Sequence, residues 1–148
     1  MCTGALSPAF APTTNAYTSS VGNSVTNTTV TANAFSGGST LQLRINGGAY
    51  SPLTSGAASA ALSLNVGDNT IDVLVTAADL ATVNTYTITL TRRTLLQDWQ
   101  LANNAATLTG DDDGDGIPNL AEYAFNLNPH GRNPLPYSQT TAINPGDG

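Results

Sequence analysis

Apolar and polar residues alternate along most of residues 16–93, and this period of two predicts β-strands. The alternating segments are rich in β-branched residues, and Gly, Asn and Pro separate them. Because no helical pattern intervenes, the segments predict a mainly β fold, an antiparallel β-sandwich. The predicted strands span residues 16–21, 25–34, 39–45, 60–64, 70–77 and 84–92.

One face of several predicted strands is apolar and should point into the core. Asn46-Gly47-Gly48 predicts a tight turn, and residues 51–59 form a loose Ser/Gly/Ala segment without strand alternation. The predicted core residues are Leu41, Leu43, Ile45, Ile71, Val73, Val75, Tyr86, Ile88 and Leu90.

The period changes after residue 93, where apolar residues take helical spacing within residues 94–103. A second short helix is predicted over residues 119–127, with Pro118 near its start and Asn128-Pro129 at its end. The chain therefore divides into a sandwich (1–93), a helix–loop–helix unit (94–130) and an extended or disordered tail (131–148).

Composition excludes several classes of partner. Charged residues make up 9% of the chain, and the net charge is −6. With four Arg and no Lys, the chain lacks the charge to bind nucleic acid or to form a basic membrane-surface patch. No apolar run approaches the roughly 18 residues of a membrane span. This polar, nearly neutral surface suits an extracellular or cell-surface β-module whose export signal lies outside this chain.

No arrangement of residues indicates catalysis, so we expect the protein not to be an enzyme. His130 is the single histidine and stands in a Pro/Gly/Asn segment without a nucleophile or acid pattern. No serine stands in a G-x-S-x-G context. The single cysteine, Cys2, forms neither an intramolecular disulfide nor a cysteine zinc site.

Half of the ten acidic residues lie in residues 111–122, which match the calcium-loop pattern D-x-[DN]-x-[DN]-G-x5-E at every defined position. Calcium takes about six to eight oxygen ligands, and acids at alternate positions of a tight loop point their oxygens at one centre. Gly116 stands where the loop must turn sharply. The predicted Ca²⁺ ligands are the side chains of Asp111, Asp113, Asp115, Asn119 and Glu122 and the carbonyl of Ile117.

The alternative is a solvated acidic turn before a helix, where carboxylates are also favoured. The complete match favours the calcium loop, and a cation would relieve the repulsion among its adjacent carboxylates. Pro118, at position eight, has no N–H with which to pair to a second loop. We therefore expect a lone structural site, with a dissociation constant of roughly 10⁻⁴–10⁻³ M.

Three segments carry a family resemblance: residues 4–17 (GALSPAFAPTTNAY), 67–73 (GDNTIDV) and 85–92 (TYTITLTR). Together they resemble the bacterial cadherin-like β-sandwich domain over residues 4–93. The resemblance implies an immunoglobulin-like, non-catalytic sandwich, found in tandem with neighbouring domains of secreted or surface proteins. The family pattern has a strand before Leu6-Ser7-Pro8, so we expect that strand to be missing and its open edge to allow weak self-association.

Residues 95–129 resemble a second unit, the thrombospondin-type-3-like or dockerin-like single calcium loop, with an EF-hand-like ligand pattern. The resemblance rests on an aromatic helix, the run DDDGDGIPNLAEYAF and the closing Asn128-Pro129. A dockerin carries two such loops, and this chain has one. Binding to a cohesin partner is therefore disfavoured.

Two functional hypotheses follow. The first is a non-catalytic calcium-binding structural module of a larger secreted or cell-surface bacterial protein. The second is an adhesion module that binds carbohydrate or a surface protein through the sandwich face or an open edge. Sugar stacking on Tyr17, Tyr50 or Tyr86 would serve the second hypothesis, although packing is the commoner role of such residues.

Overall fold

The structure is a computed structural model that describes residues 4–133. The chain forms two compact units, Met1–Asp98 and Trp99–Gly148. The boundary between them falls inside helix α1 (Leu95–Ala102), a few residues after the boundary expected at residue 93. The residues predicted as a tail lie outside the described part from residue 134 onward.

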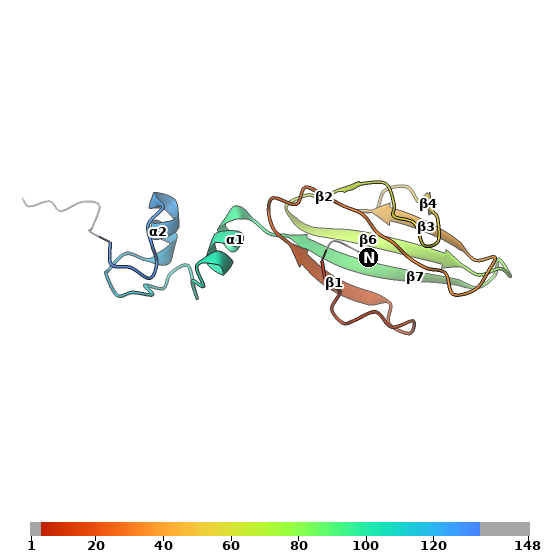
Figure 1. The fold of residues 1–148 in the computed structure, drawn as a ribbon, viewed down its shortest axis with the longest axis horizontal. Helices are drawn as coiled ribbons and strands as arrows, with labels where there is room; N and C mark the ends of the chain where they lie inside the picture. Colours follow the sequence, from red (N-terminus) through yellow and green to blue (C-terminus); the bar gives the residue numbers. More distant parts are fainter. Residues whose placement is uncertain (1–3, 134–148) are drawn as a thin grey trace, which may run out of the picture. The chain divides into compact units, whose positions relative to one another are not determined.

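A five-stranded sheet forms the main layer of the first unit, in the order β1-β7-β6-β3-β4 (Figure 1). Neighbouring strands run antiparallel except β1 and β7, which are parallel, with Tyr17 opposite Ile88. The mainly β, sandwich-like fold that was expected is therefore confirmed, and the parallel pairing of β1 with β7 is a departure from the antiparallel pairing expected. Parallel neighbours need a crossover, and here the whole chain between β1 and β7 supplies it. The strands are β1 (Ala16–Val21), β3 (Thr40–Ile45), β4 (Ser51–Leu53), β6 (Gly67–Thr76) and β7 (Val83–Arg92).

The second layer contains a short antiparallel ladder, β2 (Asn27–Thr28) with β5 (Leu62–Ser63), and a single bridge between Thr31 and Ala58. The long strand predicted over residues 25–34 is therefore mostly irregular. Serine hydroxyls replace ladder carbonyls here: Ser59 Oγ accepts from the N–H of Val30 at 3.0 Å. Such side-chain bonds to the backbone compete with regular pairing.

The core lies between the two layers and consists of the predicted alternating positions. Leu43 and Ile71 are 2% and 0% exposed, and Leu90 is fully buried. Ile45, Val75 and Tyr86 are partly buried at the margin of this cluster. The prediction of inward-facing strand residues is thus confirmed, and burial of these side chains is the main source of stability for the first unit.

The predicted turn after β3 is also present. Asn46 and Gly47 have φ angles of 50° and 72°, which the tight hairpin turn requires. The strand β4 that follows was not predicted, because its short segment Ser-Pro-Leu lacks alternation. Pro52 fits there because β4 is an edge strand, where the missing N–H costs no ladder bond.

Both predicted helices form, as α1 (Leu95–Ala102) and α2 (Asn119–Phe125). A reciprocal capping box starts α1: Thr94 Oγ1 accepts from the N–H of Gln97, and Gln97 Oε1 accepts from the N–H of Thr94. In the second unit the rings of Trp99 and Tyr123 meet edge to face at 5.5 Å. No helix within residues 4–133 is long and apolar enough to cross a membrane.

Candidate metal centre

The acidic loop brings three of its predicted ligands together. One carboxylate oxygen from each of Asp111, Asp113 and Asp115 lies within 4.8 Å of the other two. Gly114 and Gly116, with φ angles of 72° and 90°, allow the chain to fold back tightly between these acids. The spacing predicted from the sequence therefore produces a convergent cluster of oxygens.

Backbone N–H groups hold the loop around its first acid. Asp111 Oδ1 accepts from the N–H of Gly114, and Asp111 Oδ2 accepts from the N–H of Gly116, both at 2.8 Å. The bond from Gly116 is the main cause that lowers the pKa of Asp111. Asp115 Oδ1 accepts likewise from the N–H of Ile117 at 2.8 Å. These backbone N–H groups thus favour the ionised form of Asp111 and hold the carboxylate of Asp115 in place.

Three predicted ligands carry buried oxygen atoms that accept no hydrogen bond from the described residues: Asp113 Oδ2, Asn119 Oδ1 and Glu122 Oε2. Asn119 and Glu122 are 0% exposed. A buried acceptor without a partner costs roughly 1–3 kcal/mol, and more for a charged group. A bound cation would remove this cost, whereas a solvated acidic turn would have no such buried oxygens.

Glu122, in the first turn of α2, is not one of the three acids that meet within 4.8 Å. It is nevertheless electrostatically coupled to them. Burial first, and then the charges of Asp113 and Asp115, raise the pKa of Glu122 above its ordinary value. The loop therefore contains an uncompensated buried carboxylate at the position predicted to complete the calcium shell.

The other predicted positions are placed as follows. Asn119 Nδ2 donates to the carbonyl of Thr107 at 2.6 Å, which orients its amide. The side chain of Ile117 is 4% exposed and anchors the loop in the interior of the second unit. Asp112 is not at a ligand position of the loop pattern. Its Oδ2 accepts from the N–H of Ala106 at 3.2 Å.

Asn133 is a component of the centre that the sequence did not indicate. Its backbone N–H donates to Asp115 Oδ2 at 2.7 Å, and its Nδ2 donates to Glu122 Oε1 at 3.1 Å. The loop pattern ends at Glu122, and residue 133 falls in the segment predicted as tail. No local pattern could have shown this contact.

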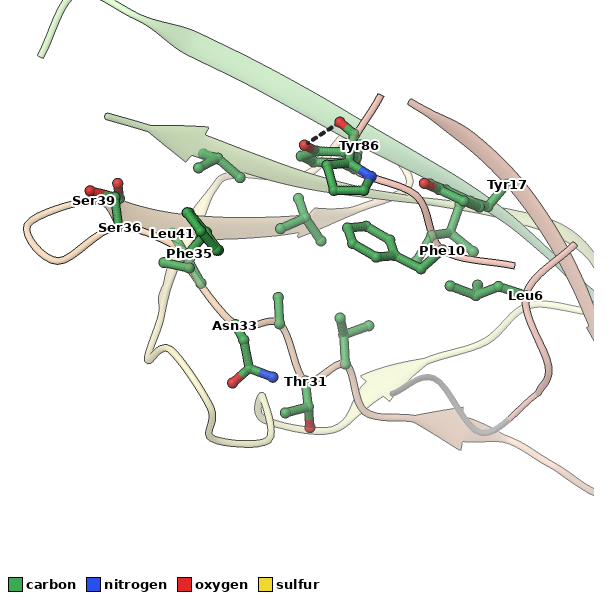
Figure 2. A pocket seen from close by; sticks show the side chains of 17 residues that line it. Leu6, Phe10, Tyr17, Thr31, Asn33, Phe35, Ser36, Ser39, Leu41 and Tyr86 are labelled. Carbon is green, nitrogen blue, oxygen red and sulfur yellow. Dashed lines mark hydrogen bonds between the residues drawn. The ribbon is translucent and has the colours of Figure 1, made fainter. Parts of the chain in front are cut away.

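The sandwich unit contains a separate apolar hollow of about 730 Å³ (Figure 2). No charged side chain lines it, and Phe10, Tyr17 and Tyr86 form one aromatic wall. Tyr86 donates its hydroxyl to the carbonyl of Pro12 at 3.0 Å, and Tyr17 donates its hydroxyl to that of Thr14 at 2.6 Å. With these hydroxyls engaged, the wall offers a ligand mainly apolar surface.

The three tyrosines considered for sugar stacking differ in how their rings are covered. Tyr17 is 3% exposed and belongs to the core, so the idea that it presents an open face to a sugar is wrong. The guanidinium of Arg44 lies 4.6 Å from the ring centroid of Tyr50, which covers one face of that ring. Tyr86 is partly buried beside Phe10. Burial thus excludes Tyr17 as a stacking platform, while Tyr50 and Tyr86 are each partly covered by a neighbouring side chain.

Comparison with known families matches the cadherin-like β-sandwich domain to residues 2–93. The chain belongs to this family. Cadherin-like domains are typically extracellular or surface modules with structural or adhesive roles, are non-catalytic, and mediate protein–protein interactions. The search of curated proteins finds no match. The family match ends before the acidic loop begins, so the case for the metal centre rests on its own geometry.

Proposed function

We propose that this chain is a non-catalytic, calcium-binding structural module of a larger secreted or cell-surface bacterial protein. The observation that carries the proposal is a pair of buried carboxylate oxygens, Asp113 Oδ2 and Glu122 Oε2, which accept no hydrogen bond from residues 4–133 and lie in a loop of converging acids. The family supports the structural or adhesive role of the sandwich, and the loop adds an ion-dependent unit after it.

The chemistry of the donors favours Ca²⁺. Every proposed ligand is an oxygen, from Asp111, Asp113, Asp115, the Ile117 carbonyl, Asn119 or Glu122. Such a hard oxygen set suits calcium or magnesium rather than zinc or copper. A Glu that binds through both oxygens suits the larger and more flexible shell of calcium.

The presence of a single calcium loop, rather than a pair, favours a structural role. Pro118 cannot pair with a partner loop, and the chain contains no second match to the pattern. With a dissociation constant of roughly 10⁻⁴–10⁻³ M, the site would remain occupied in a calcium-rich extracellular medium. We infer that calcium stabilises the helix–loop–helix unit, in the manner of the thrombospondin-type-3-like loops that it resembles.

The test uses Trp99, the only tryptophan of the chain, which lies in the second unit. Its fluorescence reports unfolding of the unit that contains the loop, separately from the sandwich. Calcium at 100 times the dissociation constant should add about 2.7 kcal/mol to the free energy of unfolding of this unit. The far-ultraviolet circular dichroism of the sandwich should change little.

The double variant Asp113→Ala plus Glu122→Ala supplies the control. It removes the two carboxylates that contain the buried oxygens, so calcium should no longer shift the Trp99 transition. An equal calcium shift in the double variant would show that the ion binds elsewhere, and the assigned loop would be wrong.

The alternative is an adhesion module, which family membership favours. The exposed Phe35 beside the hollow offers apolar surface to a protein partner rather than to a sugar. Pairing of another strand at either edge of the sheet is hindered. Ser7 already bridges to Thr18 of the edge strand β1, and Pro52 in the edge strand β4 has no N–H to donate. A specific hit on a glycan array or in a pull-down with surface proteins would favour this alternative over a purely structural role.

A further inference from the structure

Asn133 joins two acidic side chains of the loop to the chain that leaves it. Its backbone N–H bonds Asp115 Oδ2 at 2.7 Å, and its side-chain Nδ2 bonds both Glu122 Oε1 at 3.1 Å and the carbonyl of Asn128 at 2.9 Å. Residues 128–133 are thereby closed onto the acids. Asp115 and Glu122 are 18 and 11 residues away from Asn133 in the sequence.

We propose that Asn133 is a positioning residue that couples calcium binding to closure of residues 128–133 onto the loop. This inference rests on the proposed calcium site. The ion would hold residues 128–133 on the loop when it is bound, and these residues would be released when it is not.

The physical basis is the division of oxygens on Glu122. Oε1 accepts from Asn133, while Oε2 is buried with no partner among the described residues. A cation that binds Oε2, and Oε1 through the lone pair that Asn133 leaves free, holds the carboxylate in the orientation that Asn133 needs. Without the cation, the repulsion of Glu122 by the loop's aspartates favours its departure, and the bond to Asn133 is lost with it.

The same argument applies in reverse, because coupling between two binding events is reciprocal. By holding Asp115 and Glu122 in place, Asn133 reduces the cost of assembling the ligand shell. Groups that orient metal ligands in this way typically change metal affinity by about 10- to 100-fold. Calcium should therefore stabilise the closed segment by the same free energy by which closure stabilises bound calcium.

The chain contains its own reporter of closure. Arg132, which is exposed, directly precedes Asn133, and trypsin cleaves after arginine. The other three arginines are Arg44 in strand β3, Arg92 at the end of β7 and Arg93 directly after β7. Cleavage after Arg132 releases residues 133–148, which mass spectrometry identifies without ambiguity.

The experiment compares the rate of this cleavage in calcium and in chelator for the full chain. Wild-type protein should be cut about tenfold more slowly in saturating calcium, within the usual range of coupling between sites. A short arginyl peptide digested in parallel corrects for any effect of calcium on trypsin. Asn133→Ala should lose most of the protection while still binding calcium in calorimetry, about tenfold more weakly.

Asn103→Ala is the matched control. It removes the same kind of side chain from the second unit, where Asn103 Nδ2 donates to the carbonyl of Trp99 and to no acid among the described residues. The backbone carbonyl of Asn103, which the ring of His130 in the closing segment contacts, is unchanged by this substitution. This variant should keep wild-type protection, and Trp99 fluorescence checks that both variants remain folded.

The outcomes separate the two proposals. Calcium binding without protection of the Arg132–Asn133 bond would overturn the coupling and leave the calcium site in place. Equal protection in Asn133→Ala would also overturn it, because closure would not depend on this side chain. A wild-type protein that binds no calcium would overturn both.

Discussion

Asp113 and Glu122 each bury one carboxylate oxygen, Oδ2 and Oε2, to which no described residue donates a hydrogen bond. Their side chains come from different parts of the loop, and the charge of Asp113 contributes to the raised pKa of Glu122. Two like charges held in a buried position are unfavourable unless a cation joins them. This relationship connects the sequence pattern to the proposed function, and it leads to predictions that concern the loop first and the sandwich second.

Gly116 should resist substitution because of its backbone conformation alone. Its φ angle is 90°, and a Cβ built there would meet no atom within 4 Å. Gly116→Ala should therefore cost about 1–2 kcal/mol through the left-handed backbone, without a steric clash. Trp99 fluorescence during urea unfolding measures this, and calcium affinity should fall as well.

The matched control for this change is Gly37→Ala. A Cβ at Gly37 also meets nothing within 4 Å, but its φ is not in the left-handed region. Because Gly37 lies in the sandwich unit, the free energy of unfolding of that unit is followed by far-ultraviolet circular dichroism, and it should stay within about 0.5 kcal/mol of wild type. Equal effects of the two substitutions would show that the turn at Gly116 does not require glycine.

Asn69 should be the most sensitive polar residue of the sandwich. It is 0% exposed, its Oδ1 accepts from the N–H of Asn65, and its Nδ2 donates to the carbonyls of Asn65, Gly67 and Leu90. Asn69→Ala leaves several of these backbone groups buried without partners. We expect a loss of about 2 kcal/mol or more in the free energy of unfolding, measured by urea titration.

Asn15→Ala tests whether burial causes that loss. Asn15 Nδ2 donates to Asn84 Oδ1 at 2.8 Å on the exposed surface of the same unit. Its removal should change the free energy of unfolding by no more than about 0.5 kcal/mol. A loss as large as that of Asn69→Ala would contradict the explanation.

Asp98 predicts how stability depends on pH. The backbone N–H of Asn23 and then the guanidinium of Arg93 lower the pKa of Asp98. A carboxylate whose pKa is lower in the folded state stabilises that state above its unfolded pKa of about 3.9, and the contribution disappears as pH falls through the folded value. The difference in unfolding free energy between wild type and Asp98→Asn should therefore shrink below about pH 4. A difference that stays constant down to the folded pKa would contradict this assignment.

The strands that alternate strictly were predictable, because the inner face of each is encoded locally. Leu41 and Leu43 in β3, or Ile88 and Leu90 in β7, reveal their burial by spacing alone. The parallel pairing of β1 with β7 was not predictable, since it depends on the path of the chain between them. The irregular second layer was missed because serine hydroxyls satisfy its backbone, which alternation does not reveal.

The candidate site divides in the same way. Asp111, Asp113 and Asp115 converge because a short loop with glycines at the right positions places them together. The spacing of these acids and glycines in the sequence was enough to predict their convergence. Asn133 joins Glu122 through the fold of the chain after α2, and no spacing rule covers that contact. Likewise, the role of Asn69 in the sandwich depends on its bonds to Leu90 and Asn46, which are distant in the sequence and meet it only in the folded structure.

Calorimetric titration of calcium into three proteins tests the central claim most directly. Wild type should bind one ion with a dissociation constant of roughly 10⁻⁴–10⁻³ M. Asp112→Asn and Asp113→Asn each remove one charge from adjacent positions. Asp112 accepts from the N–H of Ala106, whereas Asp113 has a buried oxygen that accepts from no described residue. Asp112→Asn should weaken binding by no more than about fivefold, the effect of a distant charge, whereas Asp113→Asn should leave no measurable heat of binding. Equal losses from the two substitutions, or no binding by wild type, would contradict the account.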